Sequence, residues 1–173
     1  FTMRNHLLLS LLFISITGWS CTTDSEKSTD NPFAGQNPWP DIRQERIQTL
    51  LPQAMERSGT DAWAVLCRSN NNDPLARHIG CENAVSPALF LFELKDGAVV
   101  STVFTPPGEA AALQDIALHD SIAVVNRSPG ALVEAANYIN QNVSGKLALN
   151  YSENNEIADG LSYSQYVRFT EML

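Results

Sequence analysis

Side chains that commonly carry catalysis or bind metals are scarce in this sequence. It has three histidines and three cysteines in 173 residues, and no two cysteines stand at the spacing of a zinc site. A glycine-rich phosphate loop and a Gly-x-Ser-x-Gly nucleophile motif are both absent. His6, His78 and His119 lie far apart, and no group of acidic residues accompanies any of them. The sequence therefore predicts no catalytic residue, no metal ligand and no cofactor site within this chain.

Basic residues are outnumbered by acidic ones. Eleven Lys and Arg residues against nineteen Asp and Glu residues give a net charge of −8, and no basic stretch could neutralise a run of phosphates. Nucleic acid is therefore not expected as a partner. Glycine and proline number nine each, too few for a fibrous or wholly disordered chain. The length predicts one compact domain of about 130 residues after an N-terminal leader and linker.

The N-terminal segment is typical of an exported protein. A short positive start precedes the apolar run Leu7–Ile16, which is too short to span about 30 Å of hydrocarbon. This pattern predicts a signal peptide over residues 1–20, and small residues then lead to Cys21 as in bacterial lipoproteins, although Trp19 is bulky. Two interpretations stay open: a lipid anchor on Cys21 that holds the protein at the membrane, facing the periplasm or cell surface, or a leader that is simply cleaved. Residues 21–40 are predicted to form a flexible tether.

Residues 41–173 show alternating helical and strand patterns, which predict an α/β domain. An Asp-Gly turn between two β-prone runs indicates an antiparallel hairpin. We expect a mixed sheet of about five or six strands, with helices on its faces. The expected helices are Asp41–Gly59, with Asp41 as N-cap and a break at Pro52; Gly108–His119; a helix with Ser128 as cap and Pro129 at its first position; and Leu161–Leu173. The expected strands are Ala62–Cys67, Pro87–Leu94, Val99–Phe104, Ile122–Val125 and Lys146–Asn150, of which Ile122–Val125 is expected to be buried. A polar loop is expected at Arg68–Ser86.

Two further features leave alternatives open. Cys67 and Cys81 could form a disulfide in an oxidising compartment, but two separate reduced thiols are the favoured interpretation, with Cys67 as a small core residue. The final helix has no glycine or asparagine stop after it, so we expect the chain to be part of a longer protein.

Three stretches together resemble one family. Arg46–Ala84, Gly108–Asp120 and Leu147–Tyr166 are similar to the N-terminal domain of the creatinase, prolidase and Xaa-Pro aminopeptidase superfamily, the pita-bread metallopeptidases. The similarity extends over about Asp41 to Leu173. It implies a creatinase-type N-terminal domain over residues 41–173, with the catalytic domain absent from this sequence.

The resemblance also implies partners and a role. Members of the family carry a C-terminal domain that binds two divalent metal ions, here expected to be Mn, Zn or Co, and cleaves peptides next to proline. Their N-terminal domain helps to form a homo-oligomer and can lend a loop to a neighbouring substrate cleft. The matching loop is Arg68–Asn83, in which Asp73 could bind a peptide amine and Arg77 or His78 a carboxylate. The simpler alternative is a solvated turn in which these side chains have no role in binding.

One acidic stretch near the C-terminus could suggest a cation site, but the sequence favours a turn there. Glu153, Glu156 and Asp159 lack the ligand spacing of a calcium loop, and a turn followed by a helix cap at Ser162 explains them better.

The leading hypothesis is that the chain is the non-catalytic N-terminal domain of an exported, lipid-anchored Xaa-Pro aminopeptidase-like protein. The alternatives are a membrane-anchored binding module without hydrolase activity and a gene fragment without function.

Overall fold

The computed structural model describes residues 35, 37–67, 73–81 and 86–173. The elements described below all belong to the unit Asn37–Leu173. The predicted signal peptide and the predicted lipidation at Cys21 lie outside the described residues. None of the described helices has the length and apolar character needed to cross a membrane.

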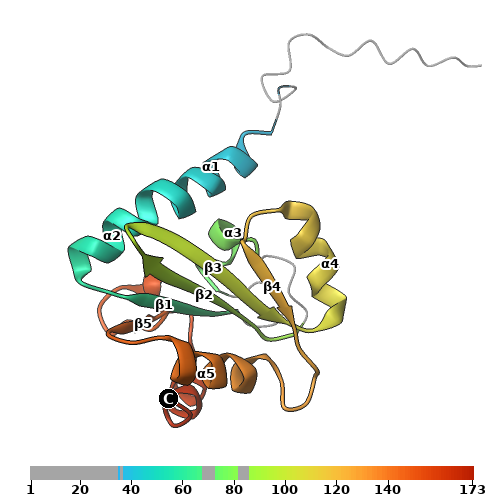
Figure 1. The fold of residues 1–173 in the computed structure, drawn as a ribbon, viewed down its shortest axis with the longest axis vertical. Helices are drawn as coiled ribbons and strands as arrows, with labels where there is room; N and C mark the ends of the chain where they lie inside the picture. Colours follow the sequence, from blue (N-terminus) through green and yellow to red (C-terminus); the bar gives the residue numbers. More distant parts are fainter. Residues whose placement is uncertain (1–34, 36, 68–72, 82–85) are drawn as a thin grey trace, which may run out of the picture. The chain divides into compact units, whose positions relative to one another are not determined.

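A five-stranded mixed sheet forms the centre of this unit, as predicted (Figure 1). The strands are β1 (Ala62–Cys67), β2 (Ala88–Lys95), β3 (Ala98–Thr105), β4 (Ser121–Val124) and β5 (Leu147–Leu149), and they lie in the order β4-β3-β2-β1-β5. β2 pairs antiparallel with both β1 and β3, whereas the outer pairs β3/β4 and β1/β5 are parallel. The unit is therefore an α/β domain, and the predicted fold class is confirmed.

The predicted hairpin joins β2 and β3 through a two-residue turn. Lys95 pairs with Ala98, and the residues between them, Asp96 and Gly97, have φ angles of +53° and +78°. This left-handed pair matches the twist of the two strands, and Asp-Gly is a sequence that adopts it at low cost.

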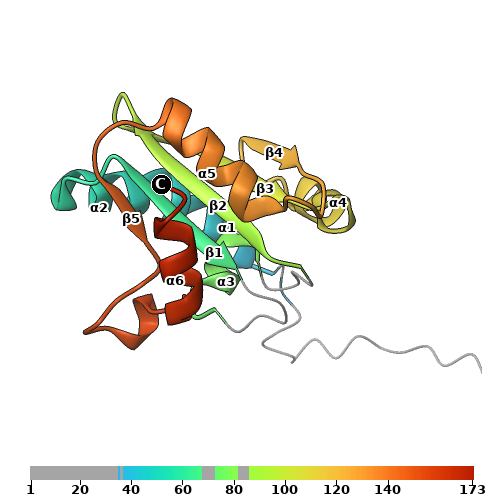
Figure 2. The same cartoon turned by 90° about the horizontal axis from the view of Figure 1, so that it is seen from below.

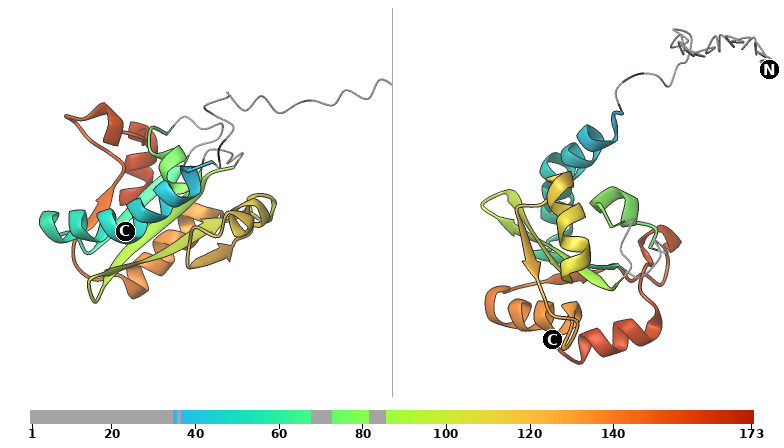
Figure 3. Two further views of the ribbon diagram at one scale, coloured as in Figure 1. Left: turned by 90° about the horizontal axis from the view of Figure 1, so that it is seen from above. Right: turned by 90° about the vertical axis from the view of Figure 1, so that its right-hand side faces the viewer.

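One face of the sheet is covered by helices from the first and middle parts of the unit. The N-terminal helical segment comprises α1 (Trp39–Glu45), a π-helical turn η1 (Arg46–Leu50) and α2 (Leu51–Ser58); α3 (Ala76–Ile79) and α4 (Pro107–Ile116) lie on the same side (Figure 3). The Leu51 N–H bonds to the Arg46 carbonyl. Pro52 has no N–H, so the irregular turn falls where the sequence predicted a break. Ile47, Ile79 and Leu113 pack here against Phe90 of β2.

The opposite face of the sheet is covered by α5 (Ala131–Asn142) and α6 (Tyr163–Thr170), which Figure 2 shows in front of the strands. α5 buries Ala131, Ala135, Ala136 and Ile139 against β2 and β3. α6 follows the short 3-10 helix η2 (Glu156–Ala158) and begins at the capping box of Ser162 and Gln165, so the predicted cap is confirmed. Phe169 of α6 is fully buried in this core.

Several predicted boundaries were wrong. α1 begins at Trp39, so Asp41 lies in the first turn rather than at the N-cap, because Pro40 is tolerated at the start of a helix. Ser128 caps no helix, since α5 starts after Gly130, whose φ of +99° breaks the helical backbone.

Two further predictions differ from the structure. The strand predicted as buried, β4, pairs only with β3 at the edge of the sheet, and Val124 is 53% exposed. The predicted polar loop Arg68–Ser86 contains the short helix α3. Apolar runs do not distinguish an edge strand from a central one, and a four-residue helix is too short to show a periodic pattern.

Candidate functional site

Asp73, predicted to bind a peptide amine, is directed into the domain. It is 5% exposed, and its Oδ2 accepts a hydrogen bond from Asn150 Nδ2 at 2.5 Å. Its Oδ1 accepts from the Leu75 N–H at 2.7 Å, and its carbonyl accepts from the Ala76 N–H at 3.1 Å. Asp73 therefore fixes the turn that begins α3, and its carboxylate is held by other residues of the domain.

Asn150, at the end of β5, is the partner that buries Asp73. It is 1% exposed, its Oδ1 accepts from the Leu66 N–H at 2.9 Å, and its Nδ2 donates to the Leu66 carbonyl at 2.9 Å. Its own carbonyl accepts from the N–H groups of Gly160 and Leu161 at 2.8 and 3.0 Å. Both polar ends of this side chain are thus hydrogen-bonded, as expected for a structural polar residue in a core.

A disulfide between Cys67 and Cys81 closes the segment that contains Asp73, with the two Cα atoms 6.4 Å apart. The interpretation as two reduced thiols was wrong. Cys81 returns to the end of β1 because Gly80 ends α3 in a left-handed conformation, and the Cys81 N–H bonds to the Ala76 carbonyl at 2.9 Å. The conformation of this turn sets the distance between the two cysteines, and that distance could not be predicted from the sequence.

His78, the second predicted site residue, lies at the surface beside α1. Its Nδ1 is the acceptor for the Arg46 guanidinium, and its ring centroid lies 5.7 Å from that of Trp39. Partial burial, followed by the charges of Arg46, Arg77 and Arg43, lowers the pKa of His78 below its ordinary value of 6.5. The imidazole is therefore neutral at physiological pH, with Nε2 as its hydrogen-bond donor.

Arg77, the third predicted residue, is exposed on α3, and its carbonyl accepts a hydrogen bond from Arg43 Nε at 2.7 Å. The guanidinium carbons of Arg43 and Arg46 lie 5.3 and 5.5 Å from the Trp39 ring. We call Arg43, Arg46, Arg77 and His78 the basic cluster. Sequence reasoning missed Arg43 of α1 and Arg46 of η1, although Trp39, Arg43 and Arg46 are spaced so that they share one helix face.

The basic cluster borders a shallow apolar hollow of about 230 Å³, to which Arg46 and His78 contribute. Ile47, Leu51 and Trp63 form part of its apolar lining. Guanidinium groups bind carboxylates well, and the hollow offers an adjacent surface for an apolar side chain. This arrangement places carboxylate-binding groups beside an apolar surface, and Asp73 does not belong to it.

His119 is held within the layer of α3 and α4. Its Nε2 donates to the Ile79 carbonyl at 2.8 Å, and its ring lies 5.1 Å from that of Phe90. Its Nδ1 is buried and has no hydrogen-bond partner among the described residues. Burial lowers the pKa of His119 below 6.5, against the smaller opposing effects of the Ile79 carbonyl and Asp120. The side chain is therefore a neutral core histidine.

No group of three or more His, Cys, Asp or Glu side chains converges among the described residues in a way that could hold a metal ion. Two of the cysteines are joined to each other, and His119 is bonded to a carbonyl. In the acidic stretch, Asp159 accepts a hydrogen bond from the Ser152 N–H at 3.3 Å. The donor set of the described residues does not fit the two-metal centre that the family resemblance assigns to a separate domain.

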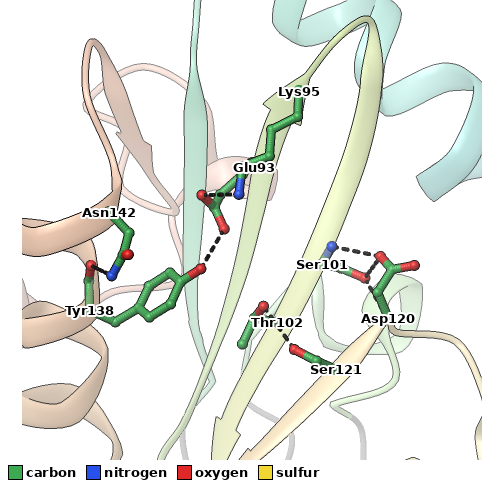
Figure 4. Close-up of polar contacts among 8 residues, drawn as sticks. All are labelled: Glu93, Lys95, Ser101, Thr102, Asp120, Ser121, Tyr138 and Asn142. Atoms are coloured by element: carbon green, nitrogen blue, oxygen red, sulfur yellow. Dashed lines mark hydrogen bonds and ion pairs between the residues drawn. The ribbon is translucent and has the colours of Figure 1, made fainter.

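Glu93 is a buried carboxylate that is paired rather than poised for catalysis (Figure 4). It is 4% exposed, and its two oxygens bind Lys95 Nζ at 2.9 Å and the Tyr138 hydroxyl at 3.2 Å. The hydrogen bond to Glu93 raises the pKa of Lys95. The pKa of Tyr138 is raised mainly by burial and, to a smaller extent, by the charge of Glu93. Nearby, Asp120 accepts from the N–H and hydroxyl of Ser101 at 2.7 and 2.9 Å. These contacts anchor α5 and β4 to the hairpin.

Comparison with known proteins identifies the fold. No family model matches the sequence, and no curated protein sequence matches it. Among solved structures, the N-terminal domain of Xaa-Pro dipeptidase from Lactobacillus brevis is similar, with a TM-score of 0.51 and 8% sequence identity, over 79% of this chain and 88% of that chain. At this identity the similarity shows the fold and not the activity. The chain therefore has the fold of the N-terminal domain of a Xaa-Pro dipeptidase, as its resemblance to the creatinase and prolidase superfamily predicted.

Proposed function

We propose that this chain is the non-catalytic N-terminal domain of an exported Xaa-Pro aminopeptidase-like protein, acting in assembly and in access of substrate to a separate catalytic domain. The observation that carries the proposal is the likeness of its fold to the N-terminal domain of a Xaa-Pro dipeptidase. In this proposal, hydrolysis of the peptide bond before proline takes place on two metal ions held outside this chain.

The basic cluster supports the part of the proposal that concerns substrate access. Arg77 is exposed and His78 is half-buried beside the hollow, so both can reach a peptide carboxylate without rearrangement of the core. Asp73 has no binding role in this proposal, because the Leu75 N–H and the Asn150 side chain already bond to its carboxylate. The substrate-facing residues proposed here are thus Arg46, Arg77 and His78.

The test begins with the coding sequence after the codon for Leu173. An in-frame continuation with Asp, Asp, His, Glu and Glu in metal-ligand order supports the proposal, and a stop codon contradicts it.

In the longer protein, Arg77→Gln is expected to raise KM about tenfold with little change in kcat, because it removes one contact to a bound carboxylate. The matched control is Arg57→Gln on α2, whose Nε bonds only to the Gln53 carbonyl among the described residues. Equal KM values for the wild type and Arg77→Gln would remove the basic cluster from the proposal.

A membrane-anchored binding module without hydrolase activity is the second candidate. The observation that favours it is Cys21 directly after an apolar leader. For this candidate, Cys21→Ser moves the protein from the membrane fraction to the soluble fraction, and the unmodified 173-residue product is stable and folded. If the variant fractionates like the wild type, the lipid anchor is not present.

A further inference from the structure

A cavity of about 300 Å³ lies where β3 ends and α4 begins. Its walls come from the start of β2, the end of β3, α4 and the residues after α3, and Phe90, Leu113 and Ile116 form part of its apolar side. Small-molecule pockets in proteins begin at about this size and combine an apolar wall with a few placed polar groups. The cavity is therefore large enough for one small molecule.

Thr105, the last residue of β3, lines this cavity and carries an unpartnered hydroxyl. Its side chain is 0% exposed, and within the part of the chain that the structure describes its Oγ1 makes no hydrogen bond. Thr105 lies on the same side of β3 as Val103, which packs with Phe90 and Leu113. Buried hydroxyls are almost always hydrogen-bonded, so an unpaired one that lines a cavity indicates a missing partner.

Arg127 supplies a positive charge next to Thr105. The Val125 N–H donates to the Thr105 carbonyl at 2.9 Å, which extends the pairing of β3 and β4 and places Arg127 two residues further on. Arg127 is exposed, lines the cavity, and has no hydrogen bond or ion pair within the described ranges. A guanidinium without a partner at the mouth of a cavity favours an anionic group there.

The start of α4 adds a donor and a negative charge. Pro106 provides no side-chain cap and Pro107 has no N–H, so the Gly108 N–H is the first amide that α4 presents, and a Cβ on Gly108 would meet nothing within 4 Å. Glu109 lines the cavity with its Oε1 bonded to the Ser86 N–H at 3.0 Å, which leaves its other oxygen available. Glu109 and Arg127 are not paired with each other, although both line the cavity.

We propose that this cavity binds a free α-amino acid with an apolar side chain. Arg127, the Gly108 N–H and the Thr105 hydroxyl hold the carboxylate, Glu109 holds the ammonium group, and the wall containing Phe90, Leu113 and Ile116 receives the side chain. The separated opposite charges match a zwitterion, whereas a simple carboxylate would leave Glu109 facing an anion. This binding does not depend on the proposed peptidase role.

Titration calorimetry of the full 173-residue chain tests the proposal with L-leucine as the probe. The expected Kd is about 1 mM or tighter. Three analogues separate the contributions: glycine lacks the side chain, 4-methylpentanoate lacks the ammonium group, and 3-methylbutylamine lacks the carboxylate. Each is expected to bind at least about tenfold more weakly than L-leucine. Equal binding of L-leucine and 4-methylpentanoate would contradict the zwitterion assignment, and no heat of binding with L-leucine would contradict the site.

Substitutions then locate the site. Arg127→Gln is expected to weaken L-leucine binding about tenfold or more, and Thr105→Val to weaken it several-fold while keeping the shape of the side chain. Glu109→Gln is expected to reduce the preference for L-leucine over 4-methylpentanoate.

The matched control is Arg168→Gln. Arg168 lines a neighbouring cavity of about 520 Å³ together with Arg127, but it does not line this one. Unchanged affinity in Arg168→Gln with reduced affinity in Arg127→Gln supports the assignment, and the reverse pattern overturns it. Arg127 is exposed, so its variant is expected to fold and the comparison stays interpretable.

Discussion

Asn150 and Thr105 are both buried polar residues near the ends of strands, yet their surroundings differ. Asn150 is 1% exposed and bonds through both ends of its amide to Leu66, with a further bond to Asp73. Thr105 is 0% exposed, and its hydroxyl has no partner among the described residues. The first arrangement is complete and stabilises the fold, whereas the second is incomplete and lines a cavity. The difference separates a structural polar group from one available to a ligand.

Replacing Asn150 should break the complete arrangement and give the largest effect. Asn150→Leu is expected to lower the free energy of unfolding by about 3–5 kcal/mol, because it leaves the Leu66 backbone groups and the Asp73 carboxylate without this partner. Urea denaturation measures the change. Asn142→Leu is the control, since Asn142 is exposed and, among the described residues, its side chain bonds only to the Tyr138 carbonyl. Its effect should stay below about 1 kcal/mol. Similar losses in the two variants would contradict the structural role of Asn150.

Gly160 tests how tightly this arrangement is closed. A Cβ at Gly160 would lie 2.0 Å from Asp73 Oδ2 and 2.6 Å from Asn150 Nδ2, so Gly160→Ala is expected to cost about 2–3 kcal/mol of stability. Gly108→Ala is the matched control at the open region, where a Cβ meets nothing within 4 Å, and it should be neutral or slightly stabilising in α4. Thermal denaturation of both variants is the measurement. Tolerance of Gly160→Ala would mean that the carboxylate and amide are not closely packed against this glycine.

His119 predicts a pH dependence that is smaller than these two effects. The pKa of His119 in the folded state is lower than its ordinary value of 6.5. As the pH falls to about 6.5 and below, the unfolded chain therefore binds a proton at this residue more readily than the folded chain does. Stability should therefore be greatest above that pH and decrease as the pH falls toward the folded-state pKa. His119→Gln, which keeps a donor for the Ile79 carbonyl, should show less of this loss between pH 7 and 5 in denaturant titrations. His78→Gln serves as the comparison, since the pKa of His78 is lowered in the same direction. A pH profile unchanged in His119→Gln would show that this imidazole does not titrate on unfolding as described.

Thr105→Val should have the smallest effect on stability, with the opposite sign. Removing an unpartnered buried hydroxyl is expected to leave the free energy of unfolding unchanged or raise it by up to about 1 kcal/mol. Thr102→Val is the control on the same strand, because Thr102 Oγ1 accepts a hydrogen bond from the Ser121 hydroxyl at 3.0 Å (Figure 4). That variant should lose about 1 kcal/mol. If Thr105→Val is the more destabilised of the two, the hydroxyl has a partner within the fold.

Local patterns in the sequence predicted the fold class and most elements. β1 was predicted at its observed bounds, because Ala62–Cys67 is an unbroken apolar run with turn residues on both sides. The Asp96-Gly97 turn specified the hairpin through its backbone preference. The edge position of β4 was not predictable in the same way, because strand order depends on contacts between distant segments.

The candidate site was harder to predict from the sequence than the fold. Arg77 and His78 were identified from a resemblance. Trp39 of α1 and Arg46 of η1 contact His78 of α3 only in the folded chain, and no local sequence pattern predicts that packing. Asp73 was placed in the wrong role, since its burial depends on Asn150, which lies 77 residues further along the chain. Thr105 carries no signal in the sequence, because a threonine in a strand is ordinary and only its missing partner distinguishes it.

The contrast between Thr105 and Asn150 is tested most directly by NMR on the ¹⁵N-labelled full chain during a titration with L-leucine. Our account predicts that the amide signals of Gly108, Leu113 and Arg127 shift in a saturable manner, while those of Gly160 and Leu161, which bond to the Asn150 carbonyl, do not move. Shifts concentrated at Gly160 and Leu161, or no saturable shift at Gly108 and Arg127, would contradict it.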